Sequence, residues 1–323
     1  MRGRAIFRIS FMPRLLWGRL ILVSFCLLLP WAPTSFAADA GEGVAVFVSR
    51  DIRPYIAAAE GISEVLSESA DVSVEVFSLE KIKGKSRDLL LERAEKDDFA
   101  LFIAIGPEAV RLISEKIAPG GAPWLYSMIL NPPGVSEAAA GACGVSLDIP
   151  AEKQLEMIGL GLPSVKRLGL LYDPRYNEAF FADASDQAGT RHLDIVPLPI
   201  SSKKDIPAVL KQHWENIDAL WLIPDQTVIS ESIVQYIIKE ALFRDAPVIG
   251  YNRFFYESGA ALAFVFDYAE IGRQTGRMAV RVLNGDACEK ALPVFQVWRN
   301  LRVINKLGIS LPENSTPPIK AGP

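Results

Sequence analysis

Short apolar runs alternate with amphipathic segments along most of the chain after residue 43. Several runs consist almost wholly of Val, Ile, Leu and Phe, as expected of parallel strands that are covered on both faces. The candidate strands are 44–49, 72–77, 99–105, 123–129, 167–172, 193–199, 219–223, 247–251, 260–266 and a last run at 293–298. Helical periodicity lies between them, as at 54–69, 152–160, 228–243 and 270–285. This β-α-β order predicts an α/β fold of doubly wound parallel sheets with right-handed crossovers.

The number of strands favours two sheets over one. The segment 131–144 is rich in turn residues and forms a natural break, with about four β-α units before it and a second series after it. The chain ends in a proline-rich stretch, and we expect residues 313–323 to be disordered.

The first 37 residues have the features of a signal peptide. Five arginines and no acidic residue precede the apolar run 20–31, and Ser35 and Ala37 occupy the small-residue positions of a cleavage site. The run is shorter than the roughly 20 residues of a membrane span. We therefore expect cleavage near Ala37 and a periplasmic location, with an uncleaved N-terminal anchor as the alternative.

Charge and composition exclude several classes of function. The leader takes five of the 34 basic residues and none of the 38 acidic ones, which leaves a net charge of −9. This argues against binding to nucleic acid or to an anionic membrane. The two histidines stand alone and no zinc motif occurs, so we expect no metal and no cofactor. Cys143 and Cys288 remain after cleavage, and the sequence leaves open whether they form a disulfide or stay buried thiols.

Candidate binding residues lie where strands give way to helices. Open α/β sheets bind ligands beyond the carboxyl ends of their strands, where helix N-termini offer N–H groups and partial positive charge. The junction Gly106-Pro107 is one such place, because a buried run there turns directly into a helix. Singly, these residues could equally cap helices or lie in ordinary loops. The candidates are Ser49, Arg50, Gly106, Pro107, Glu108, Asn131, Tyr172, Asp173, Asn177, Asp225, Tyr251, Asn252 and Asp267.

Six stretches resemble the type I, two-lobe periplasmic substrate-binding proteins of ABC transporters, and in particular the family that includes tryptophan- and tyrosine-type binding proteins. The stretches are 103-IAIGPEAV-110, 124-WLYSMILNPPG-134, 168-LGLLYDPRYNEAF-180, 219-ALWLIPDQTV-228, the block from 247-PVIGYNRFF to VLNG-285, and 301-LRVINKLGISLP-312. The block 247–285 is the most specific of them. The resemblance covers nearly all of residues 44–312.

The resemblance implies a crossover that spacing alone does not reveal. Lobe 1 would comprise 44–143 and 268–292, lobe 2 would comprise 144–267 and 293–312, and three strands would form a hinge that closes on a ligand. Three positions depart from the family pattern. Pro107 replaces a Thr or Ser, Asp173 replaces an Asn, and Asn131 replaces an Asp. The resemblance therefore does not determine the ligand.

The resulting expectation is a monomeric, exported solute-binding protein. It would capture a small polar or amphipathic ligand, amino-acid-like by family, and deliver it to an ABC permease. The alternative is a periplasmic ligand-sensing or interaction module of the same fold, which would partner a receptor or envelope complex. We do not expect this protein to be an enzyme, because G-x-S-x-G is absent and no Ser or Cys has an identifiable His partner.

Overall fold

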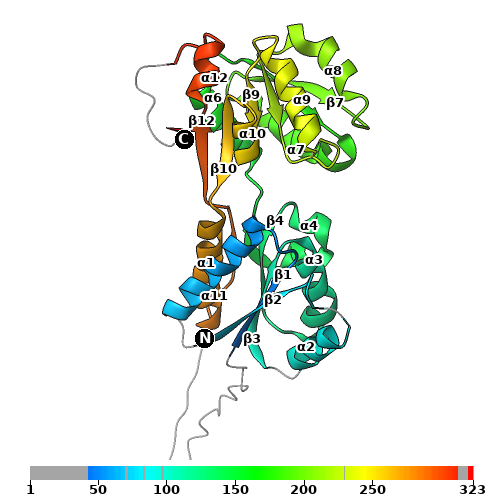
Figure 1. Cartoon of the computed structure of the whole chain (residues 1–323), viewed down its shortest axis with the longest axis vertical. Helices are drawn as coiled ribbons and strands as arrows, with labels where there is room; N and C mark the ends of the chain where they lie inside the picture. The colour runs from blue at the N-terminus through cyan, green and yellow to red at the C-terminus, as the bar shows by residue number, and fades with distance from the viewer. Residues whose placement is uncertain are drawn as a thin grey trace, which may run out of the picture. The chain divides into compact units, whose positions relative to one another are not determined.

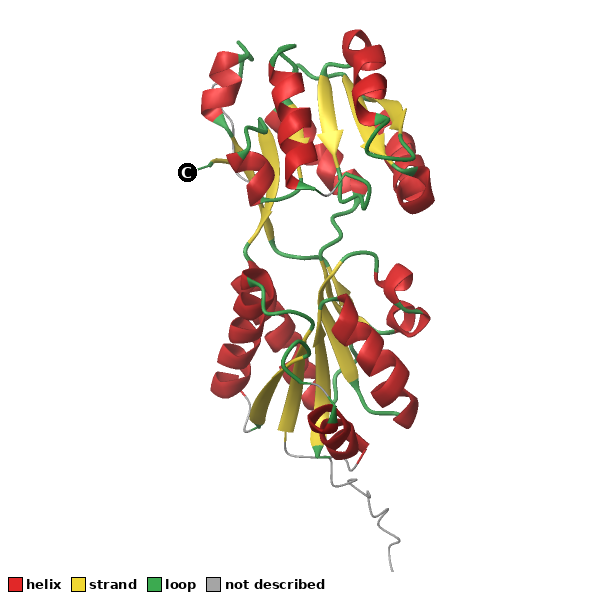
Figure 2. Ribbon diagram, turned by 45° about the vertical axis from the view of Figure 1, so that its right-hand side comes forward, coloured by secondary structure: helices red, strands yellow, loops and turns green. Residues whose placement is uncertain are grey.

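The computed structural model describes residues 43–69, 72–82, 84–95, 98–228, 230–311 and 319–322. The expected signal peptide and its cleavage site lie outside these residues. The described residues form two sheets with helices on both faces of each (Figures 1 and 2). The predicted α/β class of two mostly parallel sheets is confirmed.

The first sheet has the strand order β11-β5-β4-β3-β1-β2, and all its neighbours are parallel. Strand β1, which lies between β3 and the edge strand β2, is buried at every position. The strands are β1 Gly43–Val48, β2 Ser73–Ser78, β3 Phe99–Ile105, β4 Trp124–Ile129, β5 Cys143–Ser146 and β11 Lys290–Ala291. The helices of this lobe are α1 Arg53–Ser69, α2 Lys85–Glu95, α3 Pro107–Leu112 with its continuation Ile113–Ile117, the 3-10 turn Ala118–Gly120, α4 Pro132–Val135, α5 Glu137–Gly141 and α11 Tyr268–Leu283.

Helix α11 joins the first sheet although it follows the strands of the second. It packs along α1, and both helices contribute to one apolar cluster over the strands. Gly61 and Gly272 make this close approach possible. A Cβ on Gly61 would collide with the backbone of Ala269, and one on Gly272 would collide with the backbone of Ala58. The two helices therefore touch through their backbones, which requires glycine at both positions.

The second sheet has the strand order β13-β12-β10-β9-β8-β6-β7. Only the β10–β12 pair is antiparallel. The strands are β6 Arg167–Tyr172, β7 Asp194–Pro199, β8 Ala219–Leu222, β9 Val248–Gly250, β10 Leu262–Phe266, β12 Phe295–Arg299 and β13 Ile319–Ala321. The helices are α6 Ala151–Gly161, α7 Pro174–Gly189, α8 Ile206–His213 with the 3-10 turn Trp214–Asn216, α9 Glu231–Leu242, α10 Arg253–Glu257 and α12 Leu301–Lys306.

The chain passes between the sheets three times, after β5, after β10 and after β11. Two details differ from expectation. Strand β5 belongs to the first sheet through Ser146, so the expected boundary after residue 143 falls inside a strand. A disordered tail over 313–323 is wrong for Ile319–Ala321, which pairs with β12. Ile319 packs on the core of the second lobe, close to Gly161.

No helix among the described residues is long and apolar enough to cross a membrane. Apolar clusters on the two faces of each sheet form the cores of the two lobes.

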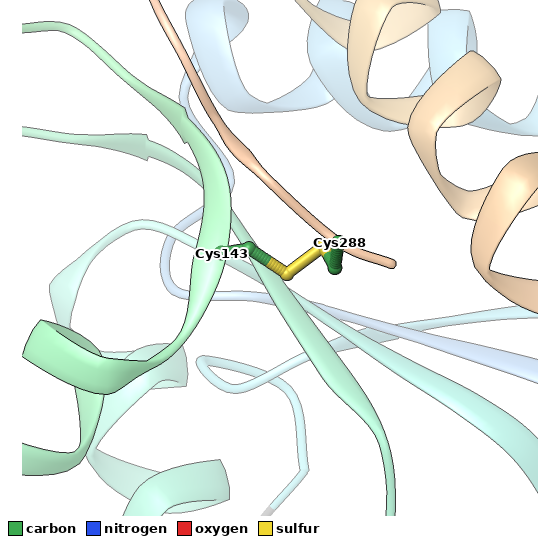
Figure 3. The surroundings of a disulfide bond; sticks show 2 residues. All are labelled: Cys143 and Cys288. Atoms are coloured by element: carbon green, nitrogen blue, oxygen red, sulfur yellow. A yellow bond between two sulfur atoms is a disulfide. The ribbon is translucent and has the colours of Figure 1, made fainter. Parts of the chain in front are cut away.

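A disulfide joins Cys143 and Cys288, which resolves the alternative that the sequence leaves open (Figure 3). Cys143 begins β5, and Cys288 lies in the segment between α11 and β11. The bond spans 145 residues of sequence, with the two Cα atoms 5.8 Å apart. It ties the returning segment to the sheet that this segment rejoins.

We expect the double variant Cys143→Ser/Cys288→Ser to lose about 3–5 kcal/mol of unfolding free energy, because the crosslink closes a long loop in the unfolded chain. Urea denaturation under non-reducing conditions measures the loss. Reduced wild type should match the variant, whose own midpoint should not respond to reductant. A variant as stable as the oxidised wild type would contradict this role for the bond.

Candidate functional site

The carboxyl ends of β1 and β3 lie side by side in the first sheet. The backbone N–H of Ser49, just after β1, donates to the carbonyl of Ile105 over 2.9 Å. Gly106 follows with a φ of 85°, a conformation that favours glycine. A Cβ at Gly106 would lie within 2.8 Å of both the Tyr55 ring and the Ser49 hydroxyl. The glycine thus lets three segments meet at this edge.

Helix α3 begins at Pro107, and the N–H of Ala109 in its first turn already has a hydrogen-bond acceptor. The Ser49 hydroxyl accepts a hydrogen bond from the Ala109 N–H over 2.9 Å, and both residues are buried. Pro107 has no N–H to offer. Ser49, from a neighbouring strand, therefore acts as the cap that Gly106 cannot provide.

Glu108 and Arg50 form an ion pair at the same edge. The Nη2 of Arg50 donates to Oε1 of Glu108 over 2.6 Å, and the Arg50 side chain is 59% exposed. Burial raises the pKa of Glu108, but the hydrogen bond and charge of Arg50, together with hydrogen bonds from its own backbone and from Ser49, leave that pKa below its ordinary value. The second carboxylate oxygen, Oε2, is buried and has no hydrogen-bond partner among the described residues.

Asn131 lies beyond β4 and is held by a carboxylate that the sequence reasoning missed. Its φ is 46°, and its backbone N–H lies 3.0 Å from each carboxylate oxygen of Asp148. Burial raises the pKa of Asp148 above its ordinary value. The available signal was its place just after β5, the same kind of junction that marked the other candidates.

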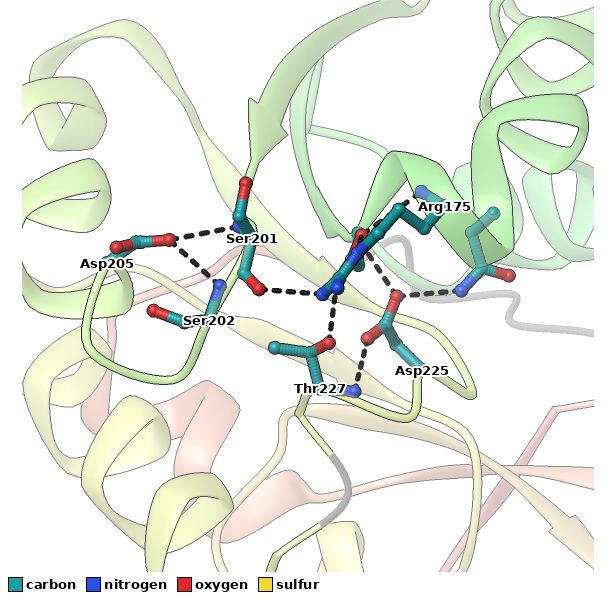
Figure 4. Close-up of polar contacts among 8 residues, drawn as sticks. Arg175, Ser201, Ser202, Asp205, Asp225 and Thr227 are labelled. Carbon is teal, nitrogen blue, oxygen red and sulfur yellow. Dashed lines mark hydrogen bonds and ion pairs between the residues drawn. The ribbon is translucent and has the colours of Figure 1, made fainter.

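The second sheet brings three candidate residues, Asp173, Asn177 and Asp225, and their neighbours into one polar network (Figure 4). Asp225 is 2% exposed, and its carboxylate accepts from the Asp173 N–H, the Thr227 N–H and the Asn177 amide, at 2.8, 2.8 and 2.7 Å. Asp173 is 1% exposed and caps α7 by accepting from the Arg175 N–H. Internal donors thus occupy both carboxylates in this structure.

Arg175 is the cation of this network. Its guanidinium donates to both carboxylate oxygens of Asp173, at 3.0 and 2.5 Å, and to the Ser201 carbonyl at 2.7 Å. Thr227 adds a hydroxyl bond to Asp173 over 2.7 Å. Arg175, with help from Thr227, holds the pKa of Asp173 well below its usual range.

The remaining candidates do not share one role. Tyr172 is buried and stacks on Phe181 at 4.8 Å between ring centroids, so it belongs to the core. Asn252 caps α10, and Asp267 caps α11 by accepting from the Glu270 N–H over 3.1 Å.

Three tyrosines at these strand ends come from different parts of the chain. Burial, followed by the nearby charge of Asp225, raises the pKa of Tyr251 to about 12. Burial also raises the pKa of Tyr55 and of Tyr268. Tyr55 and Tyr268 pack against the same apolar cluster of the first lobe, and Tyr251 packs against a cluster of the second. Of the three, only Tyr251 is among the predicted site residues.

The lowered pKa of Asp173 makes the stability of the protein depend on pH. A carboxyl group whose pKa is depressed on folding adds stability above its ordinary pKa, and that stability is lost as pH falls through the folded value. We expect Asp173→Asn to cost about 1–3 kcal/mol at pH 7, because charge-assisted bonds are lost. Measured by urea unfolding, the difference from wild type should shrink between pH 5 and pH 3, a range about the ordinary Asp pKa.

The exposed carboxylate of Asp267 offers a matched control for that experiment. Asp267→Asn also alters a helix cap but leaves Arg175 paired, so its effect on stability at pH 7 should be smaller. A constant difference between Asp173→Asn and wild type across the range would contradict the assigned pKa direction.

The comparisons with known proteins agree with this architecture. A 25% identity over 165 residues relates the chain to the tyrosine-binding protein of Clostridioides difficile strain R20291, covering 50% of this chain and 47% of that protein. The chain thus matches about half the length of this curated relative.

Solved structures share the fold over most of their length. An open, ligand-free substrate-binding protein with adhesive properties from Clostridium difficile is 19% identical, with a TM-score of 0.67, over 87% of this chain and 99% of that one. An ABC domain in complex with L-Trp from Streptococcus pneumonia is 21% identical, with a TM-score of 0.58, over 84% and 96%. The family model for ABC transporter substrate binding proteins matches residues 43–316. The chain belongs to this family of ABC transporter substrate-binding proteins.

Proposed function

We propose that this protein is exported to the periplasm, captures an amino-acid-like ligand between its lobes and delivers it to an ABC permease. Membership of the family supports capture of a small solute. Two similar proteins are a tyrosine-binding protein and an ABC domain in complex with L-Trp, which supports an aromatic amino acid here. The leader with five arginines supports export.

The observation that carries the proposal is the pair Arg50–Glu108. The buried Oε2 of Glu108 lacks a donor among the described residues, and an unsatisfied buried carboxylate oxygen is costly. A ligand ammonium group would supply that donor. The exposed guanidinium of Arg50 would take the ligand carboxylate, since Arg matches carboxylate geometry. Zwitterionic amino acids carry both groups on one carbon.

The tyrosines near this ion pair would contact the side chain of the ligand. Tyr55 borders Gly106, and the charge of Glu108 helps to raise its pKa. Tyr268 packs against the same apolar cluster as Tyr55. Flat, partly buried phenol rings suit an aromatic or apolar ligand side chain. The three connections between the sheets would act as the hinge that closes on such a ligand.

A second candidate function is a ligand-sensing or interaction module that partners a receptor or envelope complex. The occupation of Asp173 and Asp225 by internal donors favours it, because these carboxylates are then unavailable to a ligand. Pro107 favours it too, because this position provides neither a hydroxyl nor an N–H.

A thermal-shift screen of residues 38–323, which contain both sheets, against amino acids, peptides and nucleosides tests capture. We expect tyrosine, tryptophan or a close analogue to raise the Tm, since a ligand at 100 times its Kd stabilises the native state by about 2.7 kcal/mol. Trp124, Trp214, Trp221 and Trp298 report binding by fluorescence. A blank across all amino acids would reject an amino-acid ligand and favour the interaction module.

The variant Glu108→Gln tests the assigned role of the carboxylate. We expect about 10- to 100-fold weaker binding of the ligand found in the screen, because a charge-assisted bond to the ammonium contributes about 1.5–3 kcal/mol. Isothermal titration calorimetry measures the change. Glu137→Gln, at an exposed position of α5, is the matched control and should bind as wild type does. Unchanged affinity in Glu108→Gln would remove this residue from the site.

A further inference from the structure

Among the residues that the structure describes, strand β2 ends the first sheet and presents a partly exposed apolar face. It is the last strand of the first sheet, and a groove of about 1030 Å³ runs between it and α1. Val74 and Val76 line this groove, together with Ile56 and Ala59 of α1. Val76 is 50% exposed although it lies in the middle of the strand.

The backbone direction shows which groups are open at this edge. Leu79, just past β2, donates its N–H to the Val48 carbonyl of β1 over 2.9 Å. Because successive residues of a strand point their backbone groups to opposite sides, Val74 and Val76 point theirs away from β1. Their N–H and C=O groups therefore face outward, beyond the last strand of the sheet.

Strand β7, an edge of the second sheet, differs from β2 in the residues that face outward. Asp194 and Ile200 donate their N–H groups inward to the carbonyls of Lys166 and Tyr172. The alternate positions therefore face outward, and two of them are Pro197 and Pro199. Proline has no N–H, so β7 is blocked at outward positions whereas β2 carries valines there. Two other sheet ends, β11 and β13, are only two and three residues long.

We propose that β2 is a self-association edge, at which a second copy of this chain adds its own β2 in antiparallel orientation. A two-fold axis at Val76 would let the outward N–H and C=O of Val76 exchange bonds with those of the partner copy. The valines of both copies would then form one continuous apolar floor. This inference is independent of the ligand, and a dimer would replace the monomer expected from the sequence.

Charge selects this register over the neighbouring one. With Val76 on the axis, Glu75 of one copy lies opposite Phe77 of the other. Moving the two-fold axis by one residue along the strand, to Glu75, would place Glu75 of one copy opposite Glu75 of the other. Like charges directly opposed destabilise a strand pair. On its own copy, Glu75 is held by Arg93 at 2.6 and 3.0 Å, on the face away from the groove.

The size of the surface indicates a weak dimer. Six strand residues span about 20 Å, and α1 of 17 residues is about 25 Å long. A patch of these dimensions buries about 1,000 Å² over both copies, which is typical of transient interfaces. We therefore expect a Kd of about 10–500 µM rather than a permanent dimer.

Sedimentation velocity of residues 38–323, from about 5 to about 500 µM, tests the proposal over the range that such a Kd requires. Wild type should show a concentration-dependent rise in mass toward a dimer. Val76→Lys places two cations on the axis and should remain monomeric throughout. Val76→Pro, which copies the device of β7, should do the same by removing the outward N–H. Circular dichroism melts would confirm that each variant is folded.

A matched control lies on the second lobe. Phe243 is 72% exposed, and Phe243→Lys makes the same kind of change on another surface, so it should associate as wild type does. A wild type that stays monomeric at the highest concentration would overturn the proposal. Association that survives Val76→Lys, or that is lost in Phe243→Lys, would overturn it too, since another surface would then be responsible.

Discussion

Backbone contact between α1 and α11 is the constraint on which the two-lobe arrangement depends. Residues 268–283 follow directly on a strand of the second sheet, yet they pack over the first. Gly61 and Gly272 allow this, since a side chain at either position would drive the helices apart. The return requires the chain to cross between the sheets again before β12, and the disulfide from Cys143 to Cys288 holds the returning segment against β5. One helix–helix contact thus accounts for the discontinuous composition of both lobes.

Parallel strands then determine where polar chemistry collects. Their carboxyl ends meet at one edge of each sheet, and the side chains there divide into two kinds. In the second sheet, Arg175 and Thr227 donate to Asp173, and Asn177 and the Asp173 N–H donate to Asp225, so this rim is paired internally. In the first sheet, the Arg50–Glu108 pair is half open and leaves a carboxylate oxygen unsatisfied among the described residues. The physical contrast is between a saturated network and one with capacity for a donor.

The sequence predicted the architecture well because its signal is periodic and local. Continuous apolar runs such as 99–105 indicate strands covered on both faces, and the structure has β3 over those same residues. It predicted individual roles less well, because a junction residue can cap, pair or bind. Tyr172 follows the same pattern as the other candidates but lies in the core, stacked on Phe181. Asp148, by contrast, was missed, because its link to Asn131 spans two strand ends that only the sheet brings together.

What the sequence by itself determined is the class of fold, the alternation of elements and the edges at which polar residues gather. These follow from hydrophobic periodicity and from Gly and Pro at turns, which act over a few residues. Tertiary structure alone decided that Cys143 meets Cys288, that Ser49 caps a helix 58 residues further on, and that Ile319 adds a strand at an edge. Each of these pairs residues distant in sequence, and only the close packing of complete sheets and helices selects one partner among many of similar chemistry.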